Sequence, residues 1–382
     1  MKARTLAQRC ILLWARRRRA AAAEGQAARL LVTCTRGLGD AVLARSILAH
    51  LQRANPDLKL GVLGSRLGLE VMRTLPLAAE HRIEPAQQSL RGRLRLIGEI
   101  NKQGYTAAIA TEHTSVMVAA LLEACGIPRR IGFEPLCDCP QARYFTHAIR
   151  LDERRTHWQM LWELAKAYDV NLTLPAAPAP IRIPEAARSR VNTWWQATMP
   201  DGAAAILLHP GCGTVHDFKR WPVARFIELA ERLRERDRAT VFLLTATPPE
   251  APLAGEFARG FSGRSVACPA FTIEELAAVC ERVQVVVSGD TGIMHLAAAQ
   301  GTPTVGLFGP TAPEQWAPWG PRAILVRQSG LPCAPCIRNF RGLTPGECAH
   351  PVKSACMLSI QVEEVVQAIR RVTGESFTQT SG

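Results

Sequence analysis

A polar turn between two apolar runs carries the most informative chemistry of this chain. The turn spans Ser288 to Gly292, and small or apolar residues follow it through Ala299. The flanking runs, 283–287 and 304–308, consist mostly of β-branched and apolar residues. This order predicts a strand, a turn, a helix and a second strand. Free backbone N–H groups and the positive end of a helix dipole attract anions, so we expect a diphosphate to bind at this corner.

Four residues of this segment are candidate ligand contacts. Asp290 can cap the helix or accept a hydrogen bond from a sugar hydroxyl, while Thr291 and Gly292 offer backbone amides to a phosphate. His295 lies one turn into the expected helix, on the side of the turn residues. A lone histidine in a helix is often a core residue. Both interpretations of His295 therefore stay open, a phosphate or sugar donor and a structural side chain.

A second glycine-rich turn, Gly37-Leu-Gly39-Asp40, follows an apolar run and precedes a helical pattern. Such a turn lets the backbone approach a ligand closely and projects a carboxylate beside it. Asp40 can act as a general base on an acceptor hydroxyl, or it can be an N-cap that satisfies the amides of the first helical turn. A nicotinamide-dependent oxidoreductase is disfavoured, because Val42 replaces the third glycine of the dinucleotide fingerprint.

A third loop runs from His209 through Gly211, Gly213 and Thr214 to Lys219-Arg-Trp-Pro222. Thr214 can donate a hydrogen bond to a phosphate oxygen, and Lys219 can neutralise its charge. The alternative is that Lys219 belongs to a solvated surface at the start of a helix. We favour phosphate binding, because lysine is a common point-charge phosphate ligand beside glycine-rich loops.

Four of the twelve cysteines form the pattern Cys333-x2-Cys336-x11-Cys348-x7-Cys356. The first pair, Cys333 and Cys336, has the spacing of zinc or iron–sulfur sites, whereas the second pair, Cys348 and Cys356, is more widely spaced than in usual structural zinc sites. Reduced thiols that brace a loop are the default interpretation. A bound metal is the alternative, and His350 could then replace one ligand.

The elements that must position these loops alternate between strand and helix. Strands are expected at 29–35, 58–63, 107–111 and 130–133, and again at 204–208, 240–244 and 283–287. The proline-rich stretch 175–184 separates the two series. We therefore predict an α/β protein with two Rossmann-like parallel-sheet domains and a cleft between them. Both Asp40 and Asp290 fall at the carboxyl ends of strands, where such sheets bind ligands. We expect the last helix, 360–372, to pack against the first domain.

Composition and charge narrow the class of protein. The chain has 382 residues, 47% hydrophobic residues and a formal net charge of +13, which indicates a globular protein with a preference for anionic partners.

Eight Lys and Arg residues against one acidic residue lie within the first 29 positions. The apolar run Cys10–Trp14 beside Arg16–Arg19 is too short for a membrane span or a signal peptide. It is either a short amphipathic anchor on anionic lipid or a frayed basic tail. Without an export signal, reduced thiols in a cytosolic protein are expected.

Taken together, these segments resemble glycosyltransferase family nine, the heptosyltransferases of lipopolysaccharide core assembly. The likeness covers about residues 29–372. The run from Asp290 to Ala299 is specific to the family, whereas Gly-Leu-Gly-Asp is not. The matching segments follow the family's order: Gly37-Leu-Gly-Asp40-Ala-Val, Arg130-Ile-Gly-Phe133, His209-Pro-Gly211, Lys219-Arg-Trp-Pro222, Asp290-Thr-Gly-Ile-Met-His295-Leu-Ala-Ala-Ala299 and Gly306-Leu-Phe-Gly-Pro-Thr311.

The resemblance implies the GT-B fold and a division of labour between domains. Residues 29–175 would form the acceptor-binding domain and 185–372 the nucleotide-sugar-binding domain, with a basic arm at 1–28 and a tail at 373–382. It also implies an inverting, metal-independent single displacement without a cofactor. The donor would be a nucleotide sugar, with ADP-heptose expected first. The acceptor would be of the lipid A and inner-core type, met at the anionic inner face of the cytoplasmic membrane, and nucleic acid is not an expected partner.

The family's site residues carry over to individual positions. Asp40 takes the position of the catalytic base, with Gly37 and Gly39 in the acceptor-side loop. The donor contacts are Thr214, Lys219, Glu250, Asp290, Thr291, Gly292 and His295. Glu250 lies where the family often carries a ribose-binding glutamate, but the loop before it, Ala246-Thr-Pro-Pro249, lacks the usual glycines.

Rival functions remain at this point. A non-catalytic nucleotide-binding relative at a membrane surface would bind nucleotide without turnover. A metal or redox protein would be built on the four cysteines. Cys268-Pro-Ala-Phe271 replaces the turn that the family often has before the next helix, which leaves the nucleoside open.

Overall fold

The computed structural model describes residues 28–83, 89–213, 216–327 and 330–374. Thr214 and nearly all of the arm expected at residues 1–28 lie outside these ranges, as does the tail beyond residue 374. The chain forms two compact units. The first contains the residues up to Leu174 together with Asn339–Gly342, and the second contains Pro175–Arg338 and the residues from Leu343 onward. Each unit holds one six-stranded sheet.

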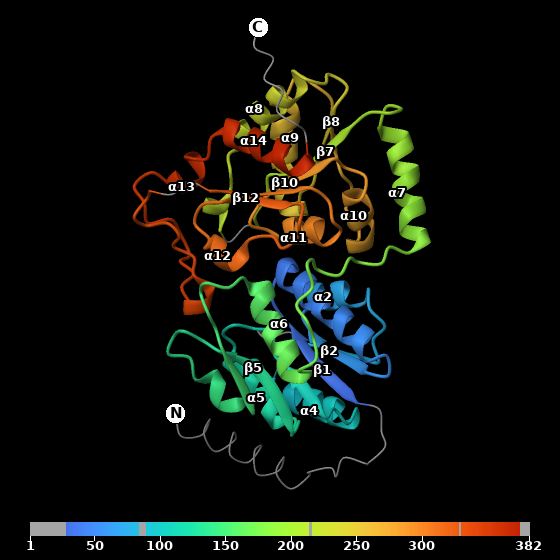
Figure 1. Cartoon of the computed structure of the whole chain (residues 1–382), viewed down its shortest axis with the longest axis vertical. Coiled ribbons are helices and arrows are strands. Elements are labelled where there is room, and N and C mark those ends of the chain that lie inside the picture. Colours follow the sequence, from blue (N-terminus) through green and yellow to red (C-terminus); the bar gives the residue numbers. More distant parts are fainter. Residues whose placement is uncertain (1–27, 84–88, 214–215, 328–329, 375–382) are drawn as a thin grey trace. The chain divides into compact units, whose positions relative to one another are not determined.

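The sheet of the first unit is parallel throughout and has the strand order β3-β2-β1-β4-β5-β6. Figure 1 labels three of its strands, β1, β2 and β5. Its strands are β1 (Arg29–Cys34), β2 (Lys59–Gly64), β3 (Ala79–Arg82), β4 (Ala107–Ile109), β5 (Arg129–Glu134) and β6 (His147–Arg150). Its helices are α2 (Leu38–Ala54), α3 (Arg66–Met72), α4 (Leu90–Lys102), α5 (Val116–Ala124) and α6 (His157–Tyr168), with a short 3-10 turn, η1 (Pro140–Tyr144). The central strands are apolar and almost completely buried, as a sheet covered on both faces requires.

The sheet of the second unit is also parallel and has the order β12-β11-β10-β7-β8-β9. Its strands are β7 (Ala205–His209), β8 (Val241–Leu244), β9 (Ser265–Ala267), β10 (Val285–Gly289), β11 (Thr304–Phe308) and β12 (Ala323–Arg327). Its helices are α7 (Glu185–Thr198), α8 (Val223–Arg234), α9 (Ala251–Gly260), α10 (Ile273–Cys280), α11 (Gly292–Ala299), α12 (Pro313–Trp316), α13 (Ala355–Leu358) and α14 (Val362–Thr373), with 3-10 turns η2 (Asp217–Lys219) and η3 (Pro248–Glu250).

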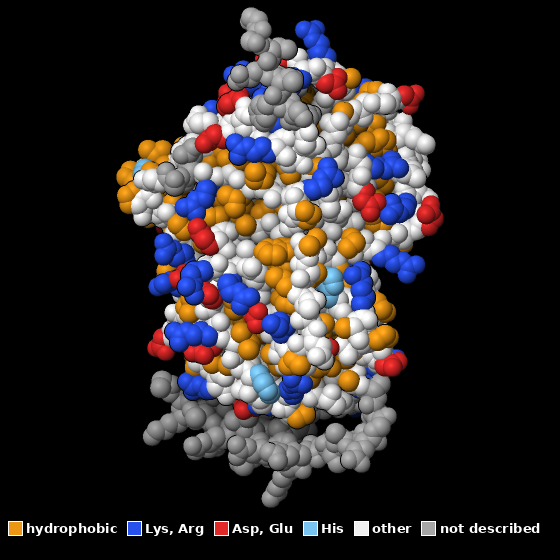
Figure 2. All heavy atoms as spheres, in the orientation of Figure 1, with side chains coloured by type: hydrophobic (Ala, Val, Ile, Leu, Met, Phe, Trp, Pro, Cys, Tyr) orange, Lys and Arg blue, Asp and Glu red, His pale blue; other side chains and the backbone are white. Residues whose placement is uncertain are grey.

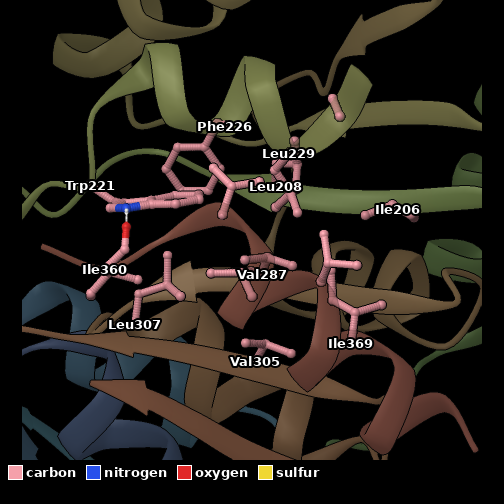
Figure 3. Close-up of a cluster of buried hydrophobic side chains, with 14 of the residues drawn as sticks. Ile206, Leu208, Trp221, Phe226, Leu229, Val287, Val305, Leu307, Ile360 and Ile369 are labelled. Atoms are coloured by element: carbon pink, nitrogen blue, oxygen red, sulfur yellow. Dashed lines mark hydrogen bonds between the residues drawn. The ribbon is translucent and has the colours of Figure 1, made fainter. Parts of the chain in front are cut away.

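The core of the second unit joins early and late parts of its sequence (Figure 3). Trp221 is buried beside Phe226 of α8, and its indole N–H donates to the carbonyl oxygen of Ile360 at 3.2 Å. Helix α14 buries Ile369 and its apolar neighbours in the same cluster. Our expectation that this last helix packs against the first domain was therefore wrong, because its apolar face is used within the second unit.

Both sheets share one topology, which fixes where ligands can bind. In each, the first strand of the unit lies beside the second strand on one side and the fourth on the other. This is the Rossmann order, and its topological switch point lies between the first and fourth strands. The prediction of an α/β protein with two Rossmann-like parallel sheets is confirmed. The switch points are the carboxyl ends of β1 and β4 in the first unit and of β7 and β10 in the second.

Two surface properties bear on partners. Within the described ranges, no helix combines the length and the apolar composition needed to cross a lipid bilayer. On the face shown in Figure 2, basic and acidic side chains are intermixed with apolar ones instead of forming one continuous basic area.

Candidate active site

Asp40 lies at the switch point of the first sheet, in the first turn of α2. The helix begins at Leu38, with Gly37 at the N-cap and no side-chain cap. The alternative interpretation of Asp40 as the N-cap is therefore wrong. Its carboxylate instead faces a histidine, with 3.5 Å between Asp40 Oδ1 and His157 Nε2. A carboxylate in the first turn also gains from the helix dipole.

Two buried histidines extend from Asp40 into the first unit. His157 is the first residue of α6, which a capping box of Thr156 and Gln159 fixes in place. His113 comes shortly after β4, and its Nε2 lies 2.8 Å from Nδ1 of His157. Phe340, from the late segment that joins this unit, packs on His113 with 5.0 Å between ring centroids. The three polar side chains thus form one line, Asp40–His157–His113.

The electrostatics of this line favour one charge state. Burial would raise the pKa of Asp40, but the hydrogen bond and charge of His157, with Arg36, outweigh burial and hold that pKa far below the ordinary aspartate range. Burial lowers the pKa of His113 well below its usual value, and the charges of His157 and Arg36 lower it further. At neutral pH Asp40 is therefore ionised and His113 is neutral.

Glu112 braces the turn that carries Asp40. Its buried carboxylate accepts hydrogen bonds from the hydroxyl of Thr33 and, through Oε1, from the backbone N–H of Thr35 at 3.0 Å and its hydroxyl at 2.7 Å. These contacts tie the end of β1 to the residues after β4. Sequence reasoning missed Glu112, His113 and His157. The signal available for Glu112 and His113 was their position directly after the apolar run 107–111.

In the second unit, the structure brings Lys219 and Asp290 together. Lys219 Nζ lies 2.8 Å from Asp290 Oδ2, and both side chains are largely buried. Asp290 does not cap α11, whose N-cap is Thr291. The hydroxyl of Thr291 instead bonds that of Ser288 at 2.8 Å. Lys219 thus lies at the turn that precedes Gly292, where the sequence predicts a diphosphate.

His295 occupies a more interior position than a ligand contact needs. It is 3% exposed on α11 and packs against Trp316 with 6.3 Å between ring centroids. This is the environment expected for the structural interpretation of His295. Its assignment as a donor contact stays a prediction.

Glu250 is bound to the glycine-rich loop after β7. Its Oε1 accepts from the backbone N–H groups of Cys212 and Gly213, both at 2.8 Å, and its Oε2 accepts from the hydroxyl of Thr247 at 2.7 Å. Burial would raise the pKa of Glu250, but these donors outweigh it and lower that pKa below the ordinary value. A Cβ at Gly211 would lie 2.5 Å from Oε2, so a larger residue there would displace the Glu250 carboxylate. Glu250 therefore organises the loop, and its role toward a ribose stays a prediction.

The four cysteines of the sequence pattern lie in the second unit. Cys333 is exposed, Cys336 and Cys348 are half-buried and Cys356 is buried. Among the described residues, Asp40, His113 and His157 form the only group of three or more His, Cys, Asp or Glu side chains with donor atoms all within 4.8 Å of one another. No three of the four cysteines, all of which are described, meet this criterion.

Comparisons with known proteins identify the family of the chain. The sequence matches the model of Glycosyltransferase family 9 (heptosyltransferase) over residues 93–344, more than half of the chain. It is 36% identical over 148 residues to lipopolysaccharide heptosyltransferase 1 of Pseudomonas aeruginosa, which covers 39% of this chain and 40% of that protein. It is 25% identical to lipopolysaccharide heptosyltransferase 2 of Escherichia coli K12, over 78% of this chain and 88% of that protein. The match to the Pseudomonas protein thus spans less than half of its length.

A solved structure supports the fold. The ADP-heptose lipopolysaccharide heptosyltransferase II of E. coli superimposes with a TM-score of 0.69 at 19% identity, covering 90% of this chain and 98% of that one. At this identity the likeness establishes the fold, which is the GT-B class predicted from the sequence.

Proposed function

Because the chain belongs to glycosyltransferase family 9, we propose that it transfers a heptose from ADP-heptose to the inner core of a lipopolysaccharide acceptor, with inversion at the sugar carbon. The observation that carries this proposal is the Lys219–Asp290 pair at the start of α11. It places a cation at a helix N-terminus, within the segment whose sequence is specific to the family.

The second unit supplies the donor side in this proposal. Thr291 and Gly292 present backbone amides to the diphosphate, and Lys219 offsets the charge that develops as the nucleoside diphosphate leaves. Asp290 orients Lys219 through their ion pair and is available to a sugar hydroxyl. Thr214, Glu250 and His295 complete the proposed donor set. A cation and a helix dipole can stabilise the leaving group without a metal ion.

The first unit supplies the base. Asp40 is ionised at neutral pH and lies at the carboxyl end of the first sheet, in the first turn of α2, which begins after Gly37. Inverting transfer requires a base on the acceptor hydroxyl, on the face of the sugar opposite the leaving group. The proposal therefore assigns the acceptor to the first unit and the proton of its hydroxyl to Asp40.

The proposal also includes a location. An inner-core acceptor is attached to lipid, so the enzyme must work at a membrane surface. The basic arm at residues 1–28 has the composition to bind anionic lipid at the inner face of the cytoplasmic membrane. On this view the enzyme is a peripheral protein of that surface.

The test is transfer from a panel of nucleotide sugars to a heptose-deficient inner-core acceptor. ADP-heptose should give product, while ADP-mannose and UDP-glucose should give little or none. Product from another sugar alone would contradict the donor assignment. Nucleotide binding without transfer from any donor would support the alternative of a non-catalytic relative.

A further inference from the structure

The proposed reaction uses Asp40 but leaves the two histidines beside it without a role. His157 and His113 are 1% and 0% exposed. The distances along the line are 3.5 Å from Asp40 Oδ1 to His157 Nε2 and 2.8 Å from His157 Nδ1 to His113 Nε2. Phe133 and Phe340 lie against His113, with ring centroids 5.9 and 5.0 Å away.

We propose that His157 takes over the proton that Asp40 removes from the acceptor hydroxyl, and that His113 holds His157 in the tautomer that can accept it. This inference rests on the proposed function and extends it to two positioning residues. The first step breaks the acceptor O–H bond as the acceptor oxygen bonds to the sugar carbon and the bond to the diphosphate oxygen breaks. The second moves the proton from the Asp40 carboxyl to His157 Nε2.

The electrostatics of the pair favour the product of the relay. The hydrogen bond and charge of His157 that lower the pKa of Asp40 act when His157 Nε2 carries a hydrogen, so they stabilise the state in which His157 holds the proton and Asp40 is ionised. When His157 receives the proton, it becomes an imidazolium beside the regenerated Asp40 carboxylate. These two opposite charges attract each other strongly in a buried site. Asp40 then contributes position and charge, and His157 contributes basicity.

The hydrogen bond to His113 determines whether Nε2 of His157 can accept the proton from Asp40. For Nε2 of His157 to accept a proton, its Nδ1 must carry the hydrogen and donate it to Nε2 of His113. His113 suits this acceptor role because burial and neighbouring charge keep it neutral. The Nδ1–H bond is retained when His157 becomes an imidazolium. Hydrogen positions in this line are thus a prediction of the relay.

The other groups that face the line do not compete for the proton. Arg36 is a cation that favours ionised Asp40. Burial and the charges of Glu112 and Asp40 raise the pKa of the Cys34 thiol well above its usual value, so the thiol stays neutral. Glu112 is occupied by hydrogen bonds from Thr33 and Thr35. His157 is left as the acceptor nearest to Asp40.

The test compares pH profiles of kcat/KM for the acceptor in wild type, His157→Gln, His113→Gln and His113→Leu, all in EDTA-treated buffer. His157→Gln should lower kcat by about 10²-fold, the low end of what a positioned proton-transfer group contributes. The acid limb of its pH profile should differ from that of the wild type, because the group that receives the proton is missing, and its affinity for ADP should stay unchanged. His113→Gln should keep most activity because its amide oxygen can accept from Nδ1–H, whereas His113→Leu should resemble His157→Gln.

The matched control is His81→Gln, a buried histidine of the same unit that bonds Tyr105 at 3.0 Å. It should lower thermal stability and leave the acid limb in place. A wild-type kcat and acid limb in His157→Gln would overturn the relay while leaving Asp40 as the base. Loss of wild-type activity in EDTA with recovery on adding a divalent cation would also overturn it.

A second measurement does not depend on turnover or on a folded variant. In wild-type protein labelled with 15N-histidine, the relay predicts that His157 carries its hydrogen on Nδ1 at neutral pH. A hydrogen on Nε2 would contradict it. If the nucleotide-sugar panel gives no transfer, the proposed function fails, and this spectrum still decides the hydrogen-bond order of the line.

Discussion

Lys219 forms an ion pair with Asp290. This ion pair affects how strongly the Lys219 ammonium group can bind a diphosphate. Because the 2.8 Å contact holds the ammonium group at the turn before Gly292, little side-chain entropy remains to be lost on binding. The two side chains are 16% and 12% exposed, so their charges are only partly screened by solvent. The pair is therefore preorganised for an anion.

Lys219→Ala should weaken ADP binding by about 10- to 100-fold, the range of a charge-assisted hydrogen bond. The unpaired Asp290 carboxylate would then also repel the diphosphate. Isothermal titration with ADP checks this, with Lys353→Ala as the control, since Lys353 pairs with Asp217 in the same unit and is exposed. Equal affinities in wild type and Lys219→Ala would remove Lys219 from the site.

Glu250→Gln should make stability less dependent on pH. The pKa of Glu250 is below its ordinary value of 4.5 in the folded protein, so the carboxylate stabilises the fold above that value and loses its contribution as pH falls through the folded pKa. We expect Glu250→Gln to cost about 1–3 kcal/mol at pH 7 and progressively less below pH 4.5. Urea unfolding from pH 7 to pH 3 measures this. The control is Glu256→Gln, at an exposed position on α9, whose stability should not depend on pH in this way. If Glu250→Gln cost the same free energy at every pH, the stabilising role of the ionised Glu250 carboxylate would be contradicted.

At the scale of elements, the close approach of α3 to the end of β1 is the contact most sensitive to a single methyl group. A Cβ at Gly68 would lie 2.1 Å from the carbonyl oxygen of Cys34, a backbone atom that cannot move aside. The same carbonyl accepts from Ser65, the N-cap of α3. The helix start and the strand that leads to Asp40 are thus one packed unit.

Gly68→Ala should therefore destabilise the protein by about 1–3 kcal/mol through overpacking. Gly98→Ala is the matched control, because it adds the same methyl group to α4, where nothing lies within 4 Å. That variant should be about 0.5–1 kcal/mol more stable than wild type, as alanine is in a helix interior. Thermal unfolding of both proteins checks the pair, and equal shifts would show that the close contact does not matter.

The sequence was sufficient to predict the central strands of both sheets, but it did not predict their edge strands. Strands such as β1, β7 and β10 are buried on both faces and consist of continuous apolar runs, which made them predictable. The edge strands β3 and β6, with the sequences AEHR and HAIR, were not predicted, because partly exposed strands mix polar and apolar residues. Helix α6 was missed as well, although Thr156 and Gln159 form a capping box that marks its start.

At the scale of the molecule, two copies of one topology each present a site at the switch point. Asp290 could be predicted because it follows an apolar strand directly, and Asp40 because it follows a glycine-rich turn between a strand and a helix. The partners of these residues could not, since His157 and Lys219 are brought to them by tertiary packing over 117 and 71 positions of sequence. Family resemblance supplied the reaction, and the structure supplied the charge states and contacts that make its residues testable.

The central claim is that Asp40 is the base of a heptose transfer, and the transfer rate of Asp40→Asn measures it most directly. With ADP-heptose and an inner-core acceptor, kcat should fall by about 10²- to 10⁴-fold while the affinity for ADP stays at the wild-type value. Asp152→Asn, in the same unit and paired with Arg154, should transfer at the wild-type rate. Wild-type turnover in Asp40→Asn would contradict the account.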